Sequence, residues 1–182
     1  ACLPQAGGIA VTGTEGVSRR DRFLINGAGG GSGTMALQLA KAAGAHVTAV
    51  DNARKVGWLT SLGADEVIDY AQVNFTQAGK QWSKILDMVA TRGPCELSRA
   101  LSKGGAYRAV GGGMTELLSI AICGKLVPGN RSLGILSVAS SGALTNRVAR
   151  LALEGRIKPL IEAVLPLSSV PEALYRAGRG AV

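Results

Sequence analysis

The feature that most constrains this chain is a run of glycines between a short apolar segment and a stretch of small side chains. The segment reads LINGAGGGSGTMAL over residues 24–37. A glycine loop between a strand and a helix lets the backbone turn tightly and lets a diphosphate approach main-chain N–H groups, while the helix points its positive end at the same place. The pattern predicts a dinucleotide site on Gly30, Gly31, Ser32 and Gly33.

The loop is not a literal G-x-G-x-x-G, because Ala28 stands at the first position, followed by Gly30 and Gly33. Such glycines also fit an ordinary turn in any α/β domain. Two observations favour the dinucleotide. The loop stands between an expected strand and an expected helix, and Asp51 ends the next expected strand, 21 positions after Gly30. A carboxylate at this place accepts hydrogen bonds from the ribose hydroxyls of NAD.

Along the whole chain, apolar strands alternate with segments of helical periodicity, which is typical of a parallel sheet with right-handed crossovers. The expected strands are residues 23–26, 47–50, 67–68, 85–89, 106–110 and 133–138, and the main expected helices are residues 33–43, 53–62, 96–101 and 144–153. A weak helix near residues 71–78 and a lead-in helix within residues 3–17 are also expected. We predict an α/β fold with a doubly wound parallel six-stranded sheet, a three-layer α/β/α Rossmann arrangement with strand order 3-2-1-4-5-6.

The pattern changes near the end of the chain. We expect the dinucleotide-binding domain to cover residues 1–158, with residues 1–20 as a lead-in segment, and a tail over residues 159–182. Within the tail, residues 161–167 fit a strand, and residues 170–177 fit a short helix with Pro171 in its first turn. The tail is not expected to join the sheet.

Charge and hydropathy exclude several classes of partner. Lys and Arg outnumber Asp and Glu by 20 to 12, but aromatic residues make up only 4% and leave few surfaces for stacking bases. We therefore expect no nucleic-acid partner and attribute the positive charge to attraction of a phosphorylated cofactor. No apolar run approaches the roughly 18 residues of a membrane span, so we expect no membrane partner. We see no signal peptide, and because the chain does not begin with Met, Ala1 is interpreted as a possible fragment start.

The cysteines and the histidine do not form a metal site in the sequence. Cys2, Cys95 and Cys123 are far apart and odd in number, which predicts a reducing, cytoplasmic setting. His46, the single histidine, lies within an expected strand and is interpreted as structural. Zinc needs clustered ligands, so we expect none, with Cys2 structural.

Five segments together resemble a known family: LINGAGGGSGTMALQL, SLGADEVIDY, ILDMV, ALSKGGAY and GRIKPLIEAVLPLSSVPEAL. On them, residues 20–170 resemble the cofactor domain of the medium-chain dehydrogenases/reductases, nearest to the zinc-free quinone oxidoreductase and alcohol-dehydrogenase-like branch. In this family Ser32 stands where a small aliphatic residue is usual. Family members carry a catalytic domain before this point, which we expect to be missing here along with the last strands after Val182.

The resemblance implies an NAD(P)H-dependent oxidoreductase that transfers hydride to a carbonyl, enone or quinone, a small-molecule substrate. The cofactor carries the hydride chemistry, and no Ser-His-Asp or Cys-His arrangement is apparent, so no catalytic residue is assigned. A second hypothesis is a non-catalytic dinucleotide-binding module or redox sensor. A third is an S-adenosylmethionine-dependent methyltransferase, which also places a glycine loop after its first strand.

Two signals conflict over the cofactor. Asp51 favours NAD(H), whereas Arg54, Lys55 and Tyr70 favour NADP(H); Lys55 and Tyr70 match family residues that hold the 2′-phosphate. Two like charges about 4 Å apart repel by about 4 kcal/mol at an effective dielectric of 20, so an Asp51 facing the phosphate would oppose NADP(H) unless the cations offset it. We favour NADP(H), with NAD(H) as the alternative.

The resemblance also implies which residues line the nicotinamide and which strand forms a dimer contact. Seven residues at the carboxyl ends of strands are expected to line the nicotinamide: Val89, Val110, Gly111, Gly112, Leu136, Ser137 and Val138. The alternative is that they are ordinary strand ends with turn glycines. Relatives often pair the sixth strand edge to edge, so we expect a homodimer through residues 133–138.

Overall fold

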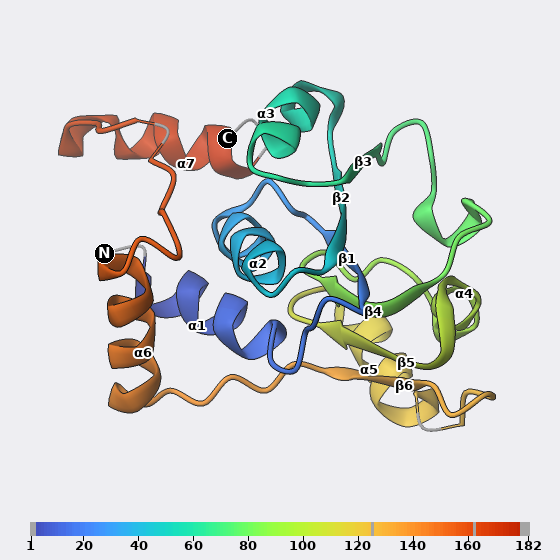
Figure 1. Ribbon diagram of the computed structural model, residues 1–182. Helices are drawn as coiled ribbons and strands as arrows, with labels where there is room; N and C mark the ends of the chain where they lie inside the picture. The colour runs from blue at the N-terminus through green and yellow to red at the C-terminus, as the bar shows by residue number, and fades with distance from the viewer. Residues whose placement is uncertain (1–2, 125, 162, 179–182) are drawn as a thin grey trace.

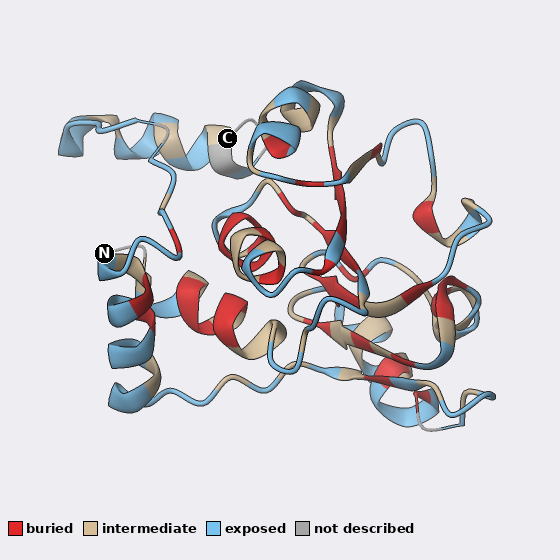
Figure 2. Cartoon of the chain, in the orientation of Figure 1, coloured by how far each residue is buried: buried red, intermediate tan, exposed pale blue. Residues whose placement is uncertain are grey.

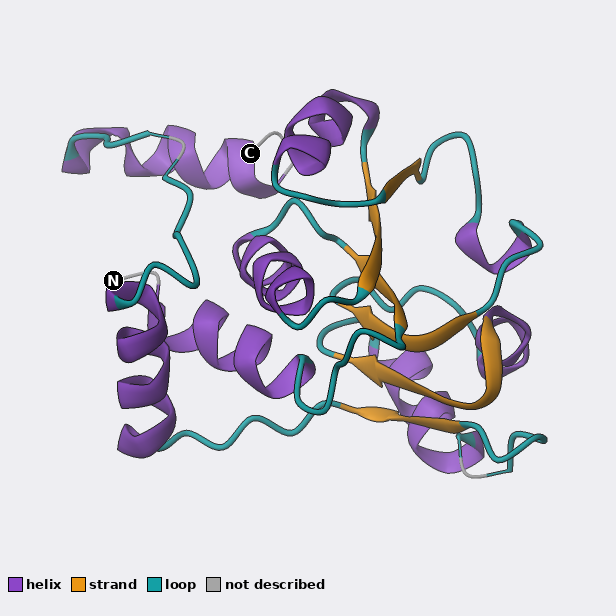
Figure 3. Ribbon diagram, viewed as in Figure 1, coloured by secondary structure: helices purple, strands orange, loops and turns teal. Residues whose placement is uncertain are grey.

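The computed structural model describes residues 3–124, 126–161 and 163–178 of the chain. Its centre is one six-stranded sheet of order β3-β2-β1-β4-β5-β6, in which every neighbouring pair is parallel. Helices lie on both sides of the sheet (Figures 1 and 3). The predicted fold class, the six strands and their order are confirmed.

The strands are β1 (Arg22–Asn26), β2 (His46–Asp51), β3 (Glu66–Asp69), β4 (Trp82–Asp87), β5 (Leu101–Ala109) and β6 (Ser132–Ile135). The α-helices are α1 (Leu3–Gly13), α2 (Gly31–Ala42), α3 (Val56–Ser61), α4 (Pro94–Ala100), α5 (Met114–Cys123), α6 (Gly142–Leu153) and α7 (Val170–Gly178). Short 3-10 turns are η1 (Ala53–Lys55), η2 (Phe75–Gln77) and η3 (Leu167–Ser169). No described helix is long and apolar enough to cross a bilayer.

Strand alternation divides the interior into two cores, one on each face of the sheet. On one face, Phe23 and Ile25 of β1 pack with α1, α2, α3 and α6. On the other face, Leu24 of β1 packs with buried residues of η2, α4 and α5. Figure 2 shows the buried positions gathered on the central strands and on the inner sides of α1 and α2. Burial on both faces explains the nearly continuous apolar runs of the central strands.

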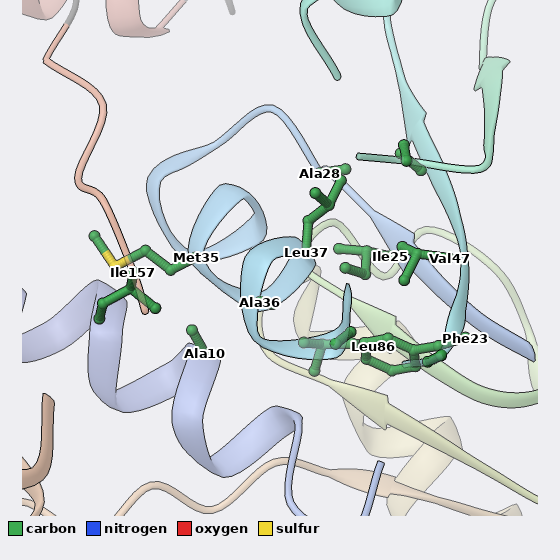
Figure 4. Packing of buried hydrophobic residues seen from close by; sticks show 14 of the residues in the cluster. Ala10, Phe23, Ile25, Ala28, Met35, Ala36, Leu37, Val47, Leu86 and Ile157 are labelled. Carbon is green, nitrogen blue, oxygen red and sulfur yellow. The ribbon is translucent and has the colours of Figure 1, made fainter. Parts of the chain in front are cut away.

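Helix α2 packs closely because its buried side chains are small. Ala36 and Ala40 are fully buried, and Figure 4 shows Met35, Ala36 and Leu37 directed toward the neighbouring elements. The helix has two buried sides, because α1 lies against it as well as the sheet. Gly44, at φ +81°, follows the helix in the left-handed conformation that glycine adopts without strain.

Two sequence-based expectations around the fifth strand are wrong. The short helix ends at Ala100 and β5 begins at once at Leu101, so Gly104 lies within the strand instead of before it. Gly104 takes φ +74° where the β4–β5 register is irregular, which a strand tolerates at a glycine. Helix α5 was not predicted, since its nearly continuous apolar sequence hides the helical period.

Three other expectations also need correction. Strand β6 ends at Ile135, short of the expected residue 138, and the expected helix near residues 71–78 shrinks to η2. The expected strand over residues 161–167 is absent from the described residues of that stretch, of which 163–166 have no regular structure. A strand needs a partner for its backbone groups, and the six-stranded sheet does not include this segment. Helix α7 confirms the predicted tail helix.

Candidate functional site

The glycine loop joins β1 to α2 and is tied to the end of β2. The N–H groups of Gly27 and Ala28 both donate to the carbonyl oxygen of Val50, at 3.0 and 3.2 Å. Gly27 has φ +81°, a conformation that glycine adopts without strain. A Cβ at Gly33 would lie 2.7 Å from the Cα of Ala28. Glycine at this position therefore lets the helix start directly against the turn.

The first turn of α2 presents the N–H groups that an α-helix leaves without an intrahelical acceptor. Helix α2 begins at Gly31, two residues before the expected start, with Gly30 as its N-cap. Gly30 donates its own N–H to Gly27 at 3.2 Å, which leaves the N–H groups of Gly31, Ser32 and Gly33 at the positive end of the helix. The Ser32 hydroxyl makes no hydrogen bond to any described residue. This end of α2 offers N–H donors to an anion, and the predicted dinucleotide contact stays a prediction.

Asp51 lies beside the loop and is held by its own chain. Its Oδ2 accepts from the N–H of Gly29 at 2.7 Å, and its Oδ1 accepts from the N–H of Asn52 at 2.9 Å and from the Asn52 amide at 3.2 Å. The residue is only 7% exposed. The carboxylate therefore holds the glycine loop and Asn52 in place, and these three hydrogen bonds use most of its capacity as an acceptor.

The predicted cation positions flank this carboxylate. Lys55 places its Nζ 3.8 Å from Oδ1 of Asp51 and donates to the carbonyl oxygen of Gly29 at 3.3 Å. Arg54 is exposed, and its N–H donates to the cap residue Asn52 at 3.1 Å. Tyr70 follows β3, donates its N–H to the Asp51 carbonyl at 3.1 Å, and its side chain is exposed. The structure thus gathers Asp51, Lys55 and the glycine loop, whereas the side chains of Arg54 and Tyr70 are exposed to solvent.

A cleft of about 460 Å³ lies over the start of α2. It is lined by the glycine loop and Thr34, by Lys55 and Trp58, and by Leu160 and Ile161 of the tail. Sequence reasoning missed Trp58, although it lies three residues after Lys55 on the same helical face. It also missed the two tail residues, for which no local signal exists.

A second cavity, of about 280 Å³, continues from the carboxyl ends of β1 and β2. Its lining residues include Tyr70, Val89, Phe75 and Arg92. Val89, expected at the nicotinamide, therefore shares a cavity with Tyr70, expected at the 2′-phosphate. The position suits the adenosine end of a dinucleotide, which binds beyond the carboxyl ends of the strands.

A third cavity, of about 470 Å³, holds three of the residues expected at the nicotinamide, Val110, Leu136 and Val138. Its other walls come from α1 and α6, including Ile9 and Leu144. The contribution of α1 is a contact between distant segments that spacing in the sequence does not reveal.

The other expected nicotinamide residues lie differently. Ser137 lines a separate cavity of about 430 Å³ on the other side of the chain after β6. Gly111 and Gly112 pack against the loop after β4, where a Cβ on Gly112 would lie 2.8 Å from the Cβ of Ala90. These two glycines thus bring the loops after β4 and β5 close together.

A buried carboxylate shapes the loop after β4. Asp87 is fully buried, and its Oδ1 accepts from the Asn26 amide at 2.8 Å and from the N–H groups of Val89 and Ala90 at 2.9 and 2.8 Å. The Tyr107 hydroxyl donates to Oδ2 at 3.0 Å. Burial, together with the nearby carboxylate, raises the pKa of Tyr107 far above its usual value. Asp87 therefore anchors this loop to the central strands rather than facing a ligand.

Residues able to bind a metal do not gather in the described part of the chain, where no group of three His, Cys, Asp or Glu side chains occurs. Cys95 and Cys123 are exposed free thiols. His46 begins β2 and is exposed, and its N–H donates to Asp21 at 3.0 Å. Cys2 lies outside the described residues, so its predicted structural role stays a prediction.

Comparison with known proteins agrees with this geometry. A family model described as zinc-binding dehydrogenase matches residues 62–182. A mitochondrial NAD(P)H oxidoreductase of Bos taurus is 32% identical over 179 residues, covering 87% of this chain and 45% of that protein. A chloroplastic quinone oxidoreductase of Triphysaria versicolor is 32% identical over 155 residues, covering 83% of this chain and 47% of that protein.

Among solved structures, the quinone oxidoreductase from Coxiella burnetii superimposes with a TM-score of 0.86 at 24% identity, covering 100% of this chain and 57% of that one. This likeness establishes a shared fold. The chain spans about half the length of the curated relatives it matches. The matched family model covers more than half of the chain, from residue 62 to residue 182. The chain therefore belongs to the zinc-binding dehydrogenase family of the medium-chain dehydrogenases/reductases, whose cofactor-binding domain it forms.

Proposed function

We propose that this chain is the cofactor-binding part of an NAD(P)H-dependent oxidoreductase. The observation that carries the proposal is the open N-terminal turn of α2 above a glycine loop that leaves no room for a Cβ at Gly33. Lys55 adds a positive charge to the same cleft. A dinucleotide diphosphate has the charge and the acceptor oxygens that this cleft can bind.

When bound, the nicotinamide supplies the hydride that reduces a carbonyl, enone or quinone. The chain's own residues bind and orient this cofactor. The diphosphate would rest on the N–H groups of Gly31, Ser32 and Gly33, and the nicotinamide would enter the cavity lined by Val110 and Leu136. Both relatives are named as oxidoreductases, which favours this function over methyl transfer.

We further propose a preference for NADP(H). Asp51 is 7% exposed and its carboxylate is hydrogen-bonded within its own chain, so it is turned away from a 2′-phosphate. Arg54 and Tyr70 are exposed, and each follows closely on an element end that borders Asp51. Charge pairing of Arg54 with a 2′-phosphate would add a charge-assisted hydrogen bond that NADH cannot form.

Titration calorimetry with NADPH and NADH tests both proposals. We expect tighter binding of NADPH, and we expect Arg54→Ala to weaken NADPH by about tenfold, typical of a lost charge-assisted bond, with NADH unchanged. Arg150→Ala, which removes the same charge from α6, serves as the control. Tighter binding of NADH would refute the cofactor preference, and binding of neither would refute the function.

Turnover separates the enzyme from a binding module or redox sensor. NADPH oxidation is followed with a quinone and an enal as acceptors, first with this chain and then with the chain extended upstream in its coding sequence. Oxidation by either form supports the oxidoreductase. Tight cofactor binding without oxidation in both forms would instead favour the non-catalytic module. Metal analysis of the same preparations tests the expected absence of zinc.

We also propose a homodimer through β6. This strand lies at the edge of the sheet, paired on one side with β5. Beside it, α5 carries Met114, Leu118 and Ile122 at intervals of four residues, with exposed fractions of 81%, 56% and 62%. A second copy related by a twofold axis would pair the two β6 edges and cover both apolar stripes at once.

Sedimentation equilibrium tests this assembly. We expect a dimer for the unaltered chain and a monomer for Leu118→Lys. Leu153→Lys, on the exposed end of α6, is the control that adds the same charge elsewhere. A monomeric unaltered chain would refute the dimer.

The cytoplasmic setting also stays a proposal, and cell fractionation is its test, because both relatives carry organellar names.

A further inference from the structure

The tail after α6 is fixed to α2 by one side chain. Gln38, on α2, accepts from the N–H of Lys158 at 2.8 Å and donates from Nε2 to the Lys158 carbonyl oxygen at 3.1 Å. The same Nε2 lies 3.1 Å from the carbonyl oxygen of Thr34. One amide thus satisfies both backbone groups of a residue 120 positions away in the sequence. A pair of reciprocal bonds fixes the orientation of the tail as well as its position.

An apolar contact next to this clamp holds the same segment. Ile157 is 1% exposed and belongs to the core formed with α1 and α2. Figure 4 shows it beside Met35 of α2 and Ala10 of α1. In Figure 1 the chain runs from this point past α2 toward α7. The clamp and the buried side chain together determine where the next residues lie.

The next residues reach the cleft over the glycine loop. Leu160 and Ile161 line it together with Lys55 and Trp58. They are 45% and 68% exposed, a large fraction for apolar side chains. The tail therefore lies along the same cleft that Gly29, Gly30 and Gly31 of the glycine loop line.

We propose that residues 157–161 form the outer wall of the diphosphate cleft, and that Gln38 is the positioning residue that holds this wall in place. The inference rests on the proposed dinucleotide function. An apolar wall excludes water from one side of the diphosphate, which strengthens its attraction to the N–H groups of α2 and to Lys55. Gln38 itself does not touch the ligand in this arrangement.

Binding of two probes distinguishes a wall from a general structural role. NADPH contains the diphosphate, whereas adenosine 2′-monophosphate has only the adenosine end and should not reach the wall. In Gln38→Ala, loss of the clamp should raise the Kd of NADPH by about fivefold to tenfold, the usual effect of one or two lost hydrogen bonds. The Kd of adenosine 2′-monophosphate should change by less than about twofold. Gln81→Ala is the control, since Gln81 also donates to a distant carbonyl, that of Arg99, away from the cleft.

The fluorescence of Trp58 tests whether the wall stays in place, and this test needs no ligand. Acrylamide should quench its fluorescence more strongly in Gln38→Ala, because the wall no longer shields that side of the cleft, whereas the fully buried Trp82 stays protected. A second variant, Leu160→Ser, keeps the clamp and changes only the wall, so it should repeat the selective loss of NADPH binding. Leu153→Ser controls for an exposed leucine outside the cleft.

The outcomes separate the two proposals. If the unaltered chain binds neither probe, the dinucleotide function itself is wrong. If it binds both, and Gln38→Ala and Leu160→Ser leave the Kd of NADPH unchanged, the wall is refuted while the function stands. Equal weakening of both probes would also overturn the wall, because it would show a general loss of structure.

Discussion

Replacing Gly33 by alanine tests the packing on which the cofactor site depends. A Cβ there would lie 2.7 Å from both the Cα and the carbonyl oxygen of Ala28, and closer still to the carbonyl oxygen of Gly27, against 3.4–4 Å for ordinary contact. These are backbone atoms, which cannot rotate away as a flexible side chain can. Helix α2 must therefore move from the loop by at least about 0.7 Å, the difference between the two distances.

The size of the effect follows from two opposing contributions. Overpacking a tight contact costs about 1–3 kcal/mol, and a rigid backbone contact belongs at the upper end of that range. Alanine in a helix gains about 1 kcal/mol over glycine. We therefore expect Gly33→Ala to lower the free energy of unfolding by about 2 kcal/mol, measured by urea denaturation with circular dichroism.

Gly57→Ala provides the matched control. Gly57 lies in α3, and a Cβ there would have nothing within 4 Å. With no clash, only the higher helix propensity of alanine changes the stability, so this variant should raise the free energy of unfolding by about 0.5–1 kcal/mol. Gly33→Ala should also weaken NADPH binding by about tenfold, because α2 moves its N–H groups away from the diphosphate. A Gly33→Ala chain as stable as the unaltered protein would refute the packing argument.

Further substitutions test other parts of the structure. Tyr107→Phe should cost about 1–3 kcal/mol, because Asp87 loses a buried hydrogen-bond donor; the stability at neutral pH measures it. Burial raises the pKa of Tyr107 in the folded protein, so its hydroxyl ionises first in the unfolded chain, and the free energy of unfolding should fall above about pH 10. Tyr107→Phe should reduce that fall. The same fall in the variant would contradict the raised pKa of Tyr107. The hydrogen bond from Lys80 lowers the pKa of Glu66 from 4.5, so the stability that the Glu66 carboxylate contributes should be lost as the pH falls below that value. Urea denaturation of Glu66→Gln from pH 6 to 2 should show a smaller loss in the free energy of unfolding than the unaltered chain. Asn52→Ala removes the cap on the N–H of Arg54 and should cost about 1 kcal/mol; thermal unfolding at several scan rates would show no change if the cap were unimportant.

Local sequence patterns predicted most of the fold because they depend on neighbouring residues alone. The glycine loop between the first strand and the next helix follows from the backbone conformations that glycine favours. The six strands and their order followed from buried apolar runs and from right-handed crossovers. The same reasoning failed where structure needed a distant partner: residues 161–167 have a strand-like pattern, but the sheet does not extend to them.

The sequence by itself determined that Asp51 would stand beside the glycine loop, since strand length and loop length set that spacing. Only the tertiary structure decided which way its carboxylate points, because the Gly29 N–H that captures it is placed by the folded loop. The cleft was likewise assembled from Trp58 and from Leu160, whose side chains share no local pattern. Contacts between segments more than a hundred residues apart, such as that of Gln38 with Lys158, depend on where whole elements pack, and no periodicity within either segment encodes that position.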